Sequence, residues 1–292
     1  EADYAARDRR GRRGLAPHQI KQARQILRPD LETALSIGGF LTGVEAQILH
    51  LTNEQIRICR RLAANPRSVV RGPAGTGKTI LATDRARQLA ANGRKVLFLC
   101  FNRLLAGHIR RSLAGDNVTG VDVRHAHALY RGIIRSGGKE AELAEEDETD
   151  PGFFARRFPE LAADALLENG GQRWDALVVD EAQDLLTPSH LDVLDLLVDG
   201  GLDHGVWHVF LDPLQNIYGS DAERAVEERL ASAYPVHDRL EDNCRNTRQV
   251  AAQTSIISGI DMAMNNAPDG LECENVSYLS RADALDQIEA VV

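Results

Sequence analysis

Short apolar runs alternate with amphipathic, helix-like segments along most of the chain from about residue 51 onward. Each run is apolar enough to be buried on both faces and is followed by a helical pattern, which is the arrangement of a parallel α/β sheet. The expected strands are residues 68–70, 95–100, 121–124, 176–179 and 207–211. We therefore predict an α/β fold with a parallel sheet of five or more strands, and a helix over residues 78–90.

Three segments do not follow this alternation. Residues 1–50 form a basic, helix-like lead-in, which either contacts phosphates or is a solvated helix face. An acidic stretch within residues 137–170 is expected to be a solvated, mobile insertion. A shift in composition after residue 219 places a domain boundary near residue 235, so that residues 51–235 form one domain and residues 236–292 begin a second.

The composition is that of a globular chain. Its 292 residues are 43% hydrophobic and 26% charged, which is enough sequence for two domains. No apolar run is long enough to span a membrane, and the polar start excludes an ordinary signal peptide, so we expect a cytoplasmic protein. Because the chain begins with Glu1 rather than methionine, we also expect it to be part of a longer protein.

Charge and cysteine usage narrow the chemistry. The formal net charge of −9 argues against wholesale electrostatic coating of nucleic acid but permits a local basic groove. The four cysteines are far apart and form no CxxC pair, so neither a zinc site nor a disulfide framework is indicated.

The strongest chemical signal is the run Gly72-Pro73-Ala74-Gly75-Thr76-Gly77-Lys78-Thr79. It matches the pattern G-x-x-x-x-G-K-[ST] in full, and it lies between a predicted strand and a predicted helix. Backbone N–H groups of such a loop, together with the N-terminus of the helix, bind phosphate oxygens. Lys78 is expected to reach the β- and γ-phosphates of ATP, and Thr79 is expected to give a hydroxyl to Mg²⁺.

Two adjacent carboxylates, Asp180 and Glu181, follow the apolar run at residues 176–179. Ligands of open parallel sheets bind at the carboxyl ends of the strands, so these acids are expected beside the phosphate loop. Asp180 is the expected holder of Mg²⁺, and Glu181 is the expected base that orients and deprotonates the attacking water.

The segment Asp180-Glu181-Ala182-Gln183-Asp184 resembles motif II of superfamily 1 helicases of the UvrD/Rep type. Other segments resemble further motifs of that family in the same order: residues 51–55 its Q motif, 98–102 motif Ia, 125–129 motif Ib, 210–218 motif III and 240–247 motif IV. The resemblance covers roughly residues 51–258. It implies a P-loop NTPase with a RecA-like sheet, the start of a second RecA-like domain, and ATP hydrolysis with Mg²⁺ to move on or remodel single-stranded DNA.

The resemblance also implies roles for single residues. Gln55 reads the adenine edge, Gln215 senses the γ-phosphate, and Arg245 acts as an arginine finger from the second domain. Gln183 belongs to the nucleotide site, where an amide can report phosphate occupancy. The residues expected to line a single-strand groove are Phe101, Asn102, His127 and Tyr218. Stacking on bases suits the two aromatic rings, with core packing as the alternative, whereas a structural role is the alternative for His127.

Several features depart from that family. Cys244 stands where an aromatic residue usually stacks on adenine, the usual base-stacking tryptophan after Tyr218 is absent, and no motif V or VI follows Asn246. The chain resembles the UvrD-like ATPases that are sometimes fused to a nuclease-related domain, so a nuclease is a second expected partner. Two functions remain open: an ATP-driven helicase or translocase, and a nucleotide-controlled docking module for a nuclease without unwinding. We expect these residues alone to bind ATP but to unwind little.

Overall fold

The computed structural model describes residues 55–60, 62–146, 148, 150, 152–213, 220–243, 246–259, 262 and 266–273. The chain divides into two units, Glu1–Gln47 and Ile48–Val292, and every described residue belongs to the second unit. The predictions for the basic lead-in and for Gln215, Tyr218 and Arg245 therefore lie outside the described residues.

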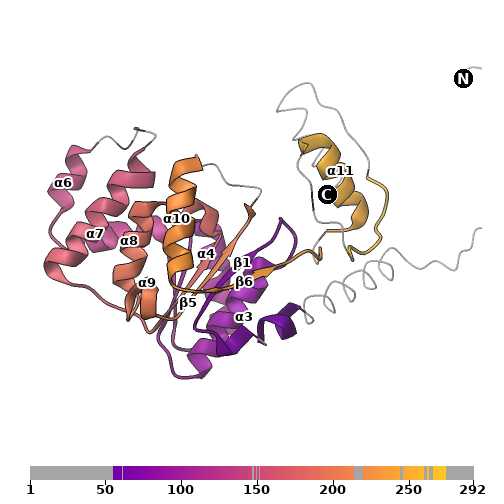
Figure 1. Ribbon diagram of the computed structural model, residues 1–292, viewed down its shortest axis with the longest axis horizontal. Coiled ribbons are helices and arrows are strands. Elements are labelled where there is room, and N and C mark those ends of the chain that lie inside the picture. The colour runs from indigo at the N-terminus through magenta and orange to yellow at the C-terminus, as the bar shows by residue number, and fades with distance from the viewer. Residues whose placement is uncertain are drawn as a thin grey trace, which may run out of the picture. The chain divides into compact units, whose positions relative to one another are not determined.

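A six-stranded parallel sheet organises the second unit, with the strand order β3-β2-β4-β5-β1-β6. Strands β1, β5 and β6 are labelled in Figure 1. The strands are β1 (Arg67–Arg71), β2 (Val96–Cys100), β3 (Val121–His125), β4 (Ala176–Asp180), β5 (Trp207–Leu211) and β6 (Val236–Arg239). The five predicted strands are confirmed to within one residue at each end. The chain therefore has the predicted fold, a RecA-like P-loop NTPase sheet flanked by helices.

The described part of the chain has the following helices: α3 (Lys78–Ala91), α4 (Arg103–Gly115), α5 (Ala126–Ser136), α6 (Glu140–Glu145), α7 (Phe158–Asn169), α8 (Pro188–Leu197), α9 (Gly201–His204), α10 (Ser220–Ser232) and α11 (Arg248–Ser258). Shorter helical turns are η1 (Leu62–Ala64), η2 (Phe153–Arg157), which is a π-helical turn, and η3 (Ala182–Asp184). No helix in this part of the chain is long and apolar enough to cross a membrane.

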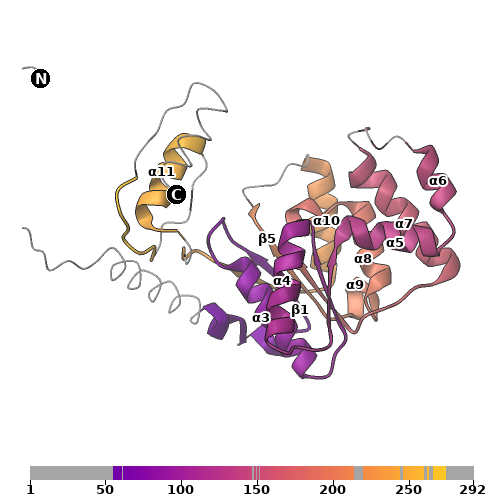
Figure 2. The same cartoon turned by 180° about the vertical axis from the view of Figure 1, so that it is seen from behind.

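Helices cover both faces of the sheet, which is why β2 and β4 are buried along their whole length. Alternate residues of a strand point to opposite faces. Phe98 of β2 and Val178 of β4 pack in one core with α3 and α4, the helices in front in Figure 2. Leu97 and Leu177 pack in the other core with α5, α7, α8 and α10. Because both sides are buried, β2 and β4 have no exposed residue to break the apolar run.

The acidic stretch forms a helix rather than the predicted loop, although Glu140, Glu142 and Glu145 are exposed to solvent as expected. Residues 140–145 form α6, and the chain then continues through η2 into α7. Phe153 and Phe158 are fully buried in the core, and a buried aromatic side chain contributes roughly 1.5–3 kcal/mol. The loop assignment is wrong because these apolar positions attach the segment to the helical layer of the sheet, whatever the charge of the residues before them.

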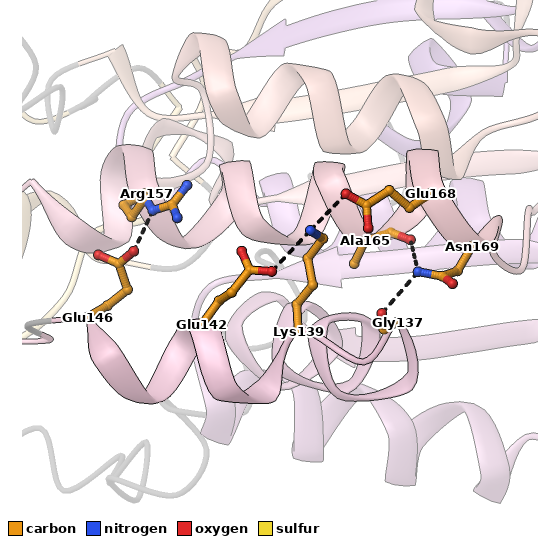
Figure 3. A network of polar contacts seen from close by, with 8 residues as sticks. All are labelled: Gly137, Lys139, Glu142, Glu146, Arg157, Ala165, Glu168 and Asn169. Carbon is orange, nitrogen blue, oxygen red and sulfur yellow. Dashed lines mark hydrogen bonds and ion pairs between the residues drawn. The ribbon is translucent and has the colours of Figure 1, made fainter.

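Ion pairs and hydrogen bonds also join α6 to its neighbours (Figure 3). The contacts are Lys139 Nζ to Glu142 and Glu168 at 3.3 and 2.8 Å, Arg157 Nε to Glu146 at 2.6 Å, and Asn169 Nδ2 to the Gly137 carbonyl at 2.9 Å. Exposed pairs of this kind contribute about 0–1 kcal/mol each, so the buried rings hold the segment more strongly than the charges do.

The expected domain boundary at residue 235 is also wrong by one strand. β6 pairs in parallel with β1, with Val70 opposite Asp238, so residues 236–239 belong to the first sheet. Its side chains are alternately half-buried and exposed, which is the pattern of an edge strand with one face in water. The assignment of the later residues to a second RecA-like domain stays a prediction.

Candidate nucleotide-binding site

The predicted nucleotide residues meet at one edge of the sheet. The carboxyl ends of parallel strands lie along the same edge, and the loops after them form the ligand site of open α/β sheets. Here the phosphate loop follows β1, the carboxylate pair follows β4, and Asp212 follows β5, which lies between those two strands. The Gly72 N–H donates to the Leu211 carbonyl at 3.1 Å, so the phosphate loop is bonded to the end of β5 from its first residue.

The glycines of the loop are required by its backbone. Gly75 and Gly77 have φ angles of 89° and 82°, in the left-handed region that residues with a Cβ rarely adopt. Gly72 is needed for close packing, because a Cβ there would lie 2.5 Å from Thr76 Oγ1. Gly77 is the N-cap of α3 and has no side chain, so it leaves the first N–H groups of the helix open to a phosphate.

Lys78 is buried and lies along its own loop. Its Nζ donates to the carbonyls of Gly72 and Pro73 at 2.8 and 3.0 Å. The same ammonium is 3.6 Å from Asp212 Oδ2, in an ion pair whose side chains are only 6% and 2% exposed. The ammonium is therefore held at the mouth of the glycine cradle, where it can neutralise phosphate charge.

Asp180 and Thr79 form the candidate magnesium position. Asp180 is fully buried, and neither of its carboxylate oxygens accepts a hydrogen bond of regular geometry. Burial raises the pKa of Asp180 to about 6, and the Thr79 hydroxyl beside it lowers that pKa only in part. A buried carboxylate with so few partners is costly on its own, and a divalent cation is the partner that such a group lacks.

The donor set fits Mg²⁺ rather than a cation held by protein alone. Within the described ranges, no group of three or more His, Cys, Asp or Glu side chains could hold a metal ion. Mg²⁺ is usually bound by one or two protein groups together with water and substrate phosphates. The Thr79 hydroxyl and the Asp180 carboxylate supply that number of oxygens next to the phosphate loop.

Glu181 has a constrained backbone at the end of β4. Its φ of 50° is left-handed, which is uncommon for a residue other than glycine and is found often at functional sites. Its Oε2 accepts a hydrogen bond from Gln183 Nε2 at 2.7 Å, and Gln183 Oε1 accepts one from the Asp212 N–H at 3.1 Å. The Glu181 carboxylate is therefore fixed by an amide that is itself attached to the next strand.

The chain after β6 returns to the phosphate loop. A Cβ on Gly75 would lie 2.8 Å from the side-chain oxygen of Asn243, so the loop apex packs against the segment predicted as motif IV. Gln55 is buried near this segment and donates to the Asp242 carbonyl at 3.3 Å. Its Oε1 is buried and accepts no hydrogen bond. The adenine-reading role of Gln55 stays a prediction.

The predicted nucleic-acid residues Phe101, Asn102 and His127 follow β2 and β3 at the same edge of the sheet. Asn102 is the N-cap of α4, since its side-chain oxygen accepts from two backbone N–H groups at 2.9 and 3.1 Å. This is a structural role. Phe101 is 36% exposed and its ring meets that of His127 edge-on at 5.0 Å, so it is both packed and accessible.

His127 is a packed histidine. Its ring stacks on Phe154 at 4.6 Å with an interplanar angle of 11°, and burial lowers its pKa to about 4. It is therefore neutral at pH 7 and is not a cation for phosphate. This geometry supports the structural alternative for His127 and leaves Phe101 as the exposed ring of the cluster.

A buried polar network lies beneath the site, between α3, β1 and β5. Arg85 Nε donates to His208 Nε2 at 3.0 Å, so the other ring nitrogen, Nδ1, carries the proton and donates to Ser68 Oγ at 2.7 Å. Burial lowers the pKa of His208 to about 3, which keeps the ring neutral. The network joins the helix that follows the phosphate loop to the two strands at the centre of the site.

Sequence reasoning missed three residues of this edge: Asp212, Asn243 and Phe154. Asp212 and Asn243 stand inside the segments recognised as motifs III and IV, but their contacts depend on which strands are neighbours. Phe154 lies in the segment that was expected to be a solvated insertion. Its aromatic neighbours in the sequence, Phe153 and Phe158, are the signal that would have indicated a packed helix.

Comparison with known proteins agrees with this site. A family model described as an AAA domain matches residues 50–202, a range that includes the phosphate loop and the Asp180–Glu181 pair. The match spans more than half of the chain. No curated protein matches the chain. The protein therefore belongs to the AAA domain family of P-loop ATPases, for which nucleotide binding and hydrolysis, typically with Mg²⁺, are the expected chemistry.

Proposed function

We propose that this protein is an ATP-driven motor of the UvrD/Rep helicase type, which hydrolyses ATP with Mg²⁺ to move on or remodel single-stranded DNA. The observation that carries the proposal is the convergence of the phosphate loop, the Asp180–Glu181 pair and the half-exposed Phe101 at one edge of a single sheet. Nucleotide chemistry and a ring suited to base stacking lie on adjacent loops there. The helicase-like order of the motifs supports the same proposal.

The hydrolytic step follows from the positions of these residues. The loop N–H groups and Lys78 bind the phosphates. Thr79 and Asp180 would hold Mg²⁺, which would supply further positive charge there. Glu181 accepts a proton from water as the water oxygen bonds to the γ-phosphorus. The bond from that phosphorus to the β,γ-bridging oxygen breaks, so the products are ADP and inorganic phosphate.

Coupling to DNA is proposed to act through the loops after β2 and β3. A base that stacks on Phe101 gains about 1–3 kcal/mol, and it does so for any sequence. β2 is the neighbour of β4, with Cys100 opposite Asp180, so the loop that carries Phe101 begins beside the magnesium position. A DNA strand bound at this loop can therefore change the positions of the residues that hydrolyse ATP.

The test is ATP hydrolysis as a function of single-stranded DNA concentration, for wild type and for Phe101→Ala. The proposal is supported if DNA raises the rate of ATP hydrolysis and if Phe101→Ala needs a higher DNA concentration than wild type for the same stimulation. Leu104→Ala is the matched control, because Leu104 is 84% exposed in the first turn of α4, directly after the loop that carries Phe101, but has no aromatic ring. If DNA does not change the rate of ATP hydrolysis, and the protein binds a nuclease in a nucleotide-dependent way, the docking module is supported instead.

A further inference from the structure

Asp212 links the two halves of the nucleotide site. It stands directly after β5, is 1% exposed, and its Oδ2 lies 3.6 Å from Lys78 Nζ. Its backbone N–H donates to Gln183 Oε1 at 3.1 Å, and Gln183 Nε2 donates to Glu181 Oε2 at 2.7 Å. A continuous polar chain of four residues therefore runs from the phosphate-loop lysine to the carboxylate that is proposed to activate water.

The amide group of Gln183 determines which of its atoms faces each neighbour in this polar chain. Gln183 uses its oxygen toward a backbone donor and its NH₂ group toward a carboxylate, and an amide is the side chain that offers both. A glutamate at position 183 would place a second carboxylate beside that of Glu181, and an aliphatic residue would make neither bond. The amide thus holds Glu181 in a position that is set by the end of β5.

The other half of this polar series concerns Lys78. An ammonium has three N–H donors, and here its neighbours are the carbonyls of Gly72 and Pro73 and the Asp212 carboxylate. A β- or γ-phosphate that enters the loop competes with these acceptors for the same ammonium. Asp212 is an anion like the phosphate, so its presence both orders the lysine and opposes the ligand.

We propose that Asp212 is a positioning residue that acts as a latch: it holds Lys78 on the phosphate loop and competes with nucleotide phosphates for it. Through the hydrogen bonds of Gln183, release of the latch is tied to the position of Glu181. The inference rests on nucleotide binding at this loop, which belongs to the proposed function. It deepens that function by naming Asp212 as the residue that competes with the nucleotide and that links nucleotide binding to the position of Glu181.

The first measurement is the Kd for Mg-ATP of wild type and Asp212→Asn, by titration calorimetry. We expect the variant to bind more tightly by about threefold to tenfold, as when a competing state that occupies most of the population is removed. Asp212→Glu, which keeps the charge, should stay nearer to wild type. Asp116→Asn is the matched control, because Asp116 pairs with Arg87 on the surface, away from the site.

Thermal unfolding separates a latch from a purely structural residue. Loss of the buried counter-ion lowers the Tm of Asp212→Asn without nucleotide, because Lys78 is left as a buried charge. Saturating Mg-ATP replaces that counter-ion, so the rise in Tm on adding nucleotide is larger for the variant than for wild type. A structural role alone would lower the Tm equally with and without nucleotide and would leave the Kd unchanged.

Turnover tests the second half of the chain. Gln183→Met keeps the length of the side chain but removes both hydrogen bonds, so we expect a lower kcat with a Kd for Mg-ATP near that of wild type. An unchanged kcat would show that Gln183 does not position Glu181, and the proposed link would be wrong.

The outcomes distinguish the latch from the proposed function. If wild type binds no Mg-ATP, the proposed function fails. If wild type binds Mg-ATP and Asp212→Asn binds it no more tightly, the latch alone is overturned. Asp212→Ser also removes the charge and serves if Asp212→Asn does not fold. Failure of both to fold, while Asp116→Asn folds, would make Asp212 a structural residue and would overturn the latch.

Discussion

Replacing the Asp180 carboxylate by an amide should make the protein more stable while it impairs Mg-nucleotide binding. Asp180 is fully buried without a regular hydrogen bond, and burial raises its pKa from 3.8 to about 6. At 1.36 kcal/mol per pKa unit, the ionised form costs the folded protein about 3 kcal/mol at pH 7. Asp180→Asn removes this charge. A buried amide without hydrogen-bond partners costs about 1–3 kcal/mol, so we expect the free energy of unfolding to rise by about 1 kcal/mol in total.

The predicted gain depends on pH with a definite sign. The folded pKa is raised, so the folded protein takes up a proton as pH falls through about 6, and the cost of the charge then disappears. The stability advantage of Asp180→Asn over wild type should be full above pH 6, fall by about 3 kcal/mol between pH 6 and about pH 4, and change sign in that range, because the penalty of the buried amide does not depend on pH. For a domain of this size, 1 kcal/mol corresponds to roughly 2–4 °C in Tm.

The assay is thermal unfolding at several pH values, with and without Mg-ATP. Without nucleotide, Asp180→Asn should unfold at a higher temperature than wild type. With Mg-ATP the order should narrow or reverse, because wild type gains binding energy that the variant has lost. If the variant is less stable than wild type at pH 7, or if the difference does not change with pH, the ionised Asp180 carboxylate does not destabilise the folded protein. Asp116→Asn, in a surface ion pair, is the control for the substitution itself.

Lys78→Ala should abolish ATP hydrolysis while circular dichroism shows a folded protein, because the phosphate charge is no longer neutralised. Glu181→Gln should keep Mg-ATP binding by calorimetry and lower kcat by at least about 100-fold, since an amide cannot accept the proton. Three histidines have pKa values lowered mainly by burial, to about 4 or about 3: His127, His190 and His208. They take up protons near pH 6.5 only when unfolded, so denaturant melts should show stability lost as pH falls below 6.5, by about 3 kcal/mol per pH unit near pH 5 after the opposing effect of Asp180.

Each of these has an outcome that would contradict it. Hydrolysis that survives in Lys78→Ala would exclude the loop as the ATP site. A Glu181→Gln protein that no longer binds Mg-ATP would show that Glu181 holds the metal or the fold rather than the proton. Stability that is constant between pH 7 and pH 5 would mean that the three histidines are protonated in the folded protein.

The sheet could be predicted from sequence because its chemistry is local. The runs that become β2 and β4 are apolar at every position but their ends, since both faces are covered by helices. The phosphate loop was equally clear, because left-handed backbone at Gly75 and Gly77 needs glycine in a fixed pattern. Such features depend on residues that are close in sequence.

Features that depend on neighbours distant in sequence were not predictable. β6 contains one apolar residue, Val236, and was not recognised as a strand because an edge strand needs few of them. The contact of Asp212 with Lys78 requires β5 to lie beside β1, which no local pattern states. Likewise, the packing of Asn243 against Gly75 depends on the course of the chain after β6.

The helical structure of the acidic segment was not predicted, for a different reason. Composition over residues 137–150 is dominated by carboxylates, and composition is a good guide only where no core residues follow. Phe153, Phe158 and Leu161 are buried within the next turns of the chain, and they outweigh the exposed charges in deciding the structure.

We propose that ATP hydrolysis at this edge of the sheet is coupled to single-stranded DNA. The most direct test is the rate of phosphate release from Mg-ATP by wild type and Glu181→Gln, each with and without saturating single-stranded DNA. We expect DNA to raise the wild-type rate several-fold and to leave the rate of Glu181→Gln near background, although that variant still binds Mg-ATP. A wild-type rate that DNA does not change, or release by Glu181→Gln as fast as by wild type, would contradict the proposal.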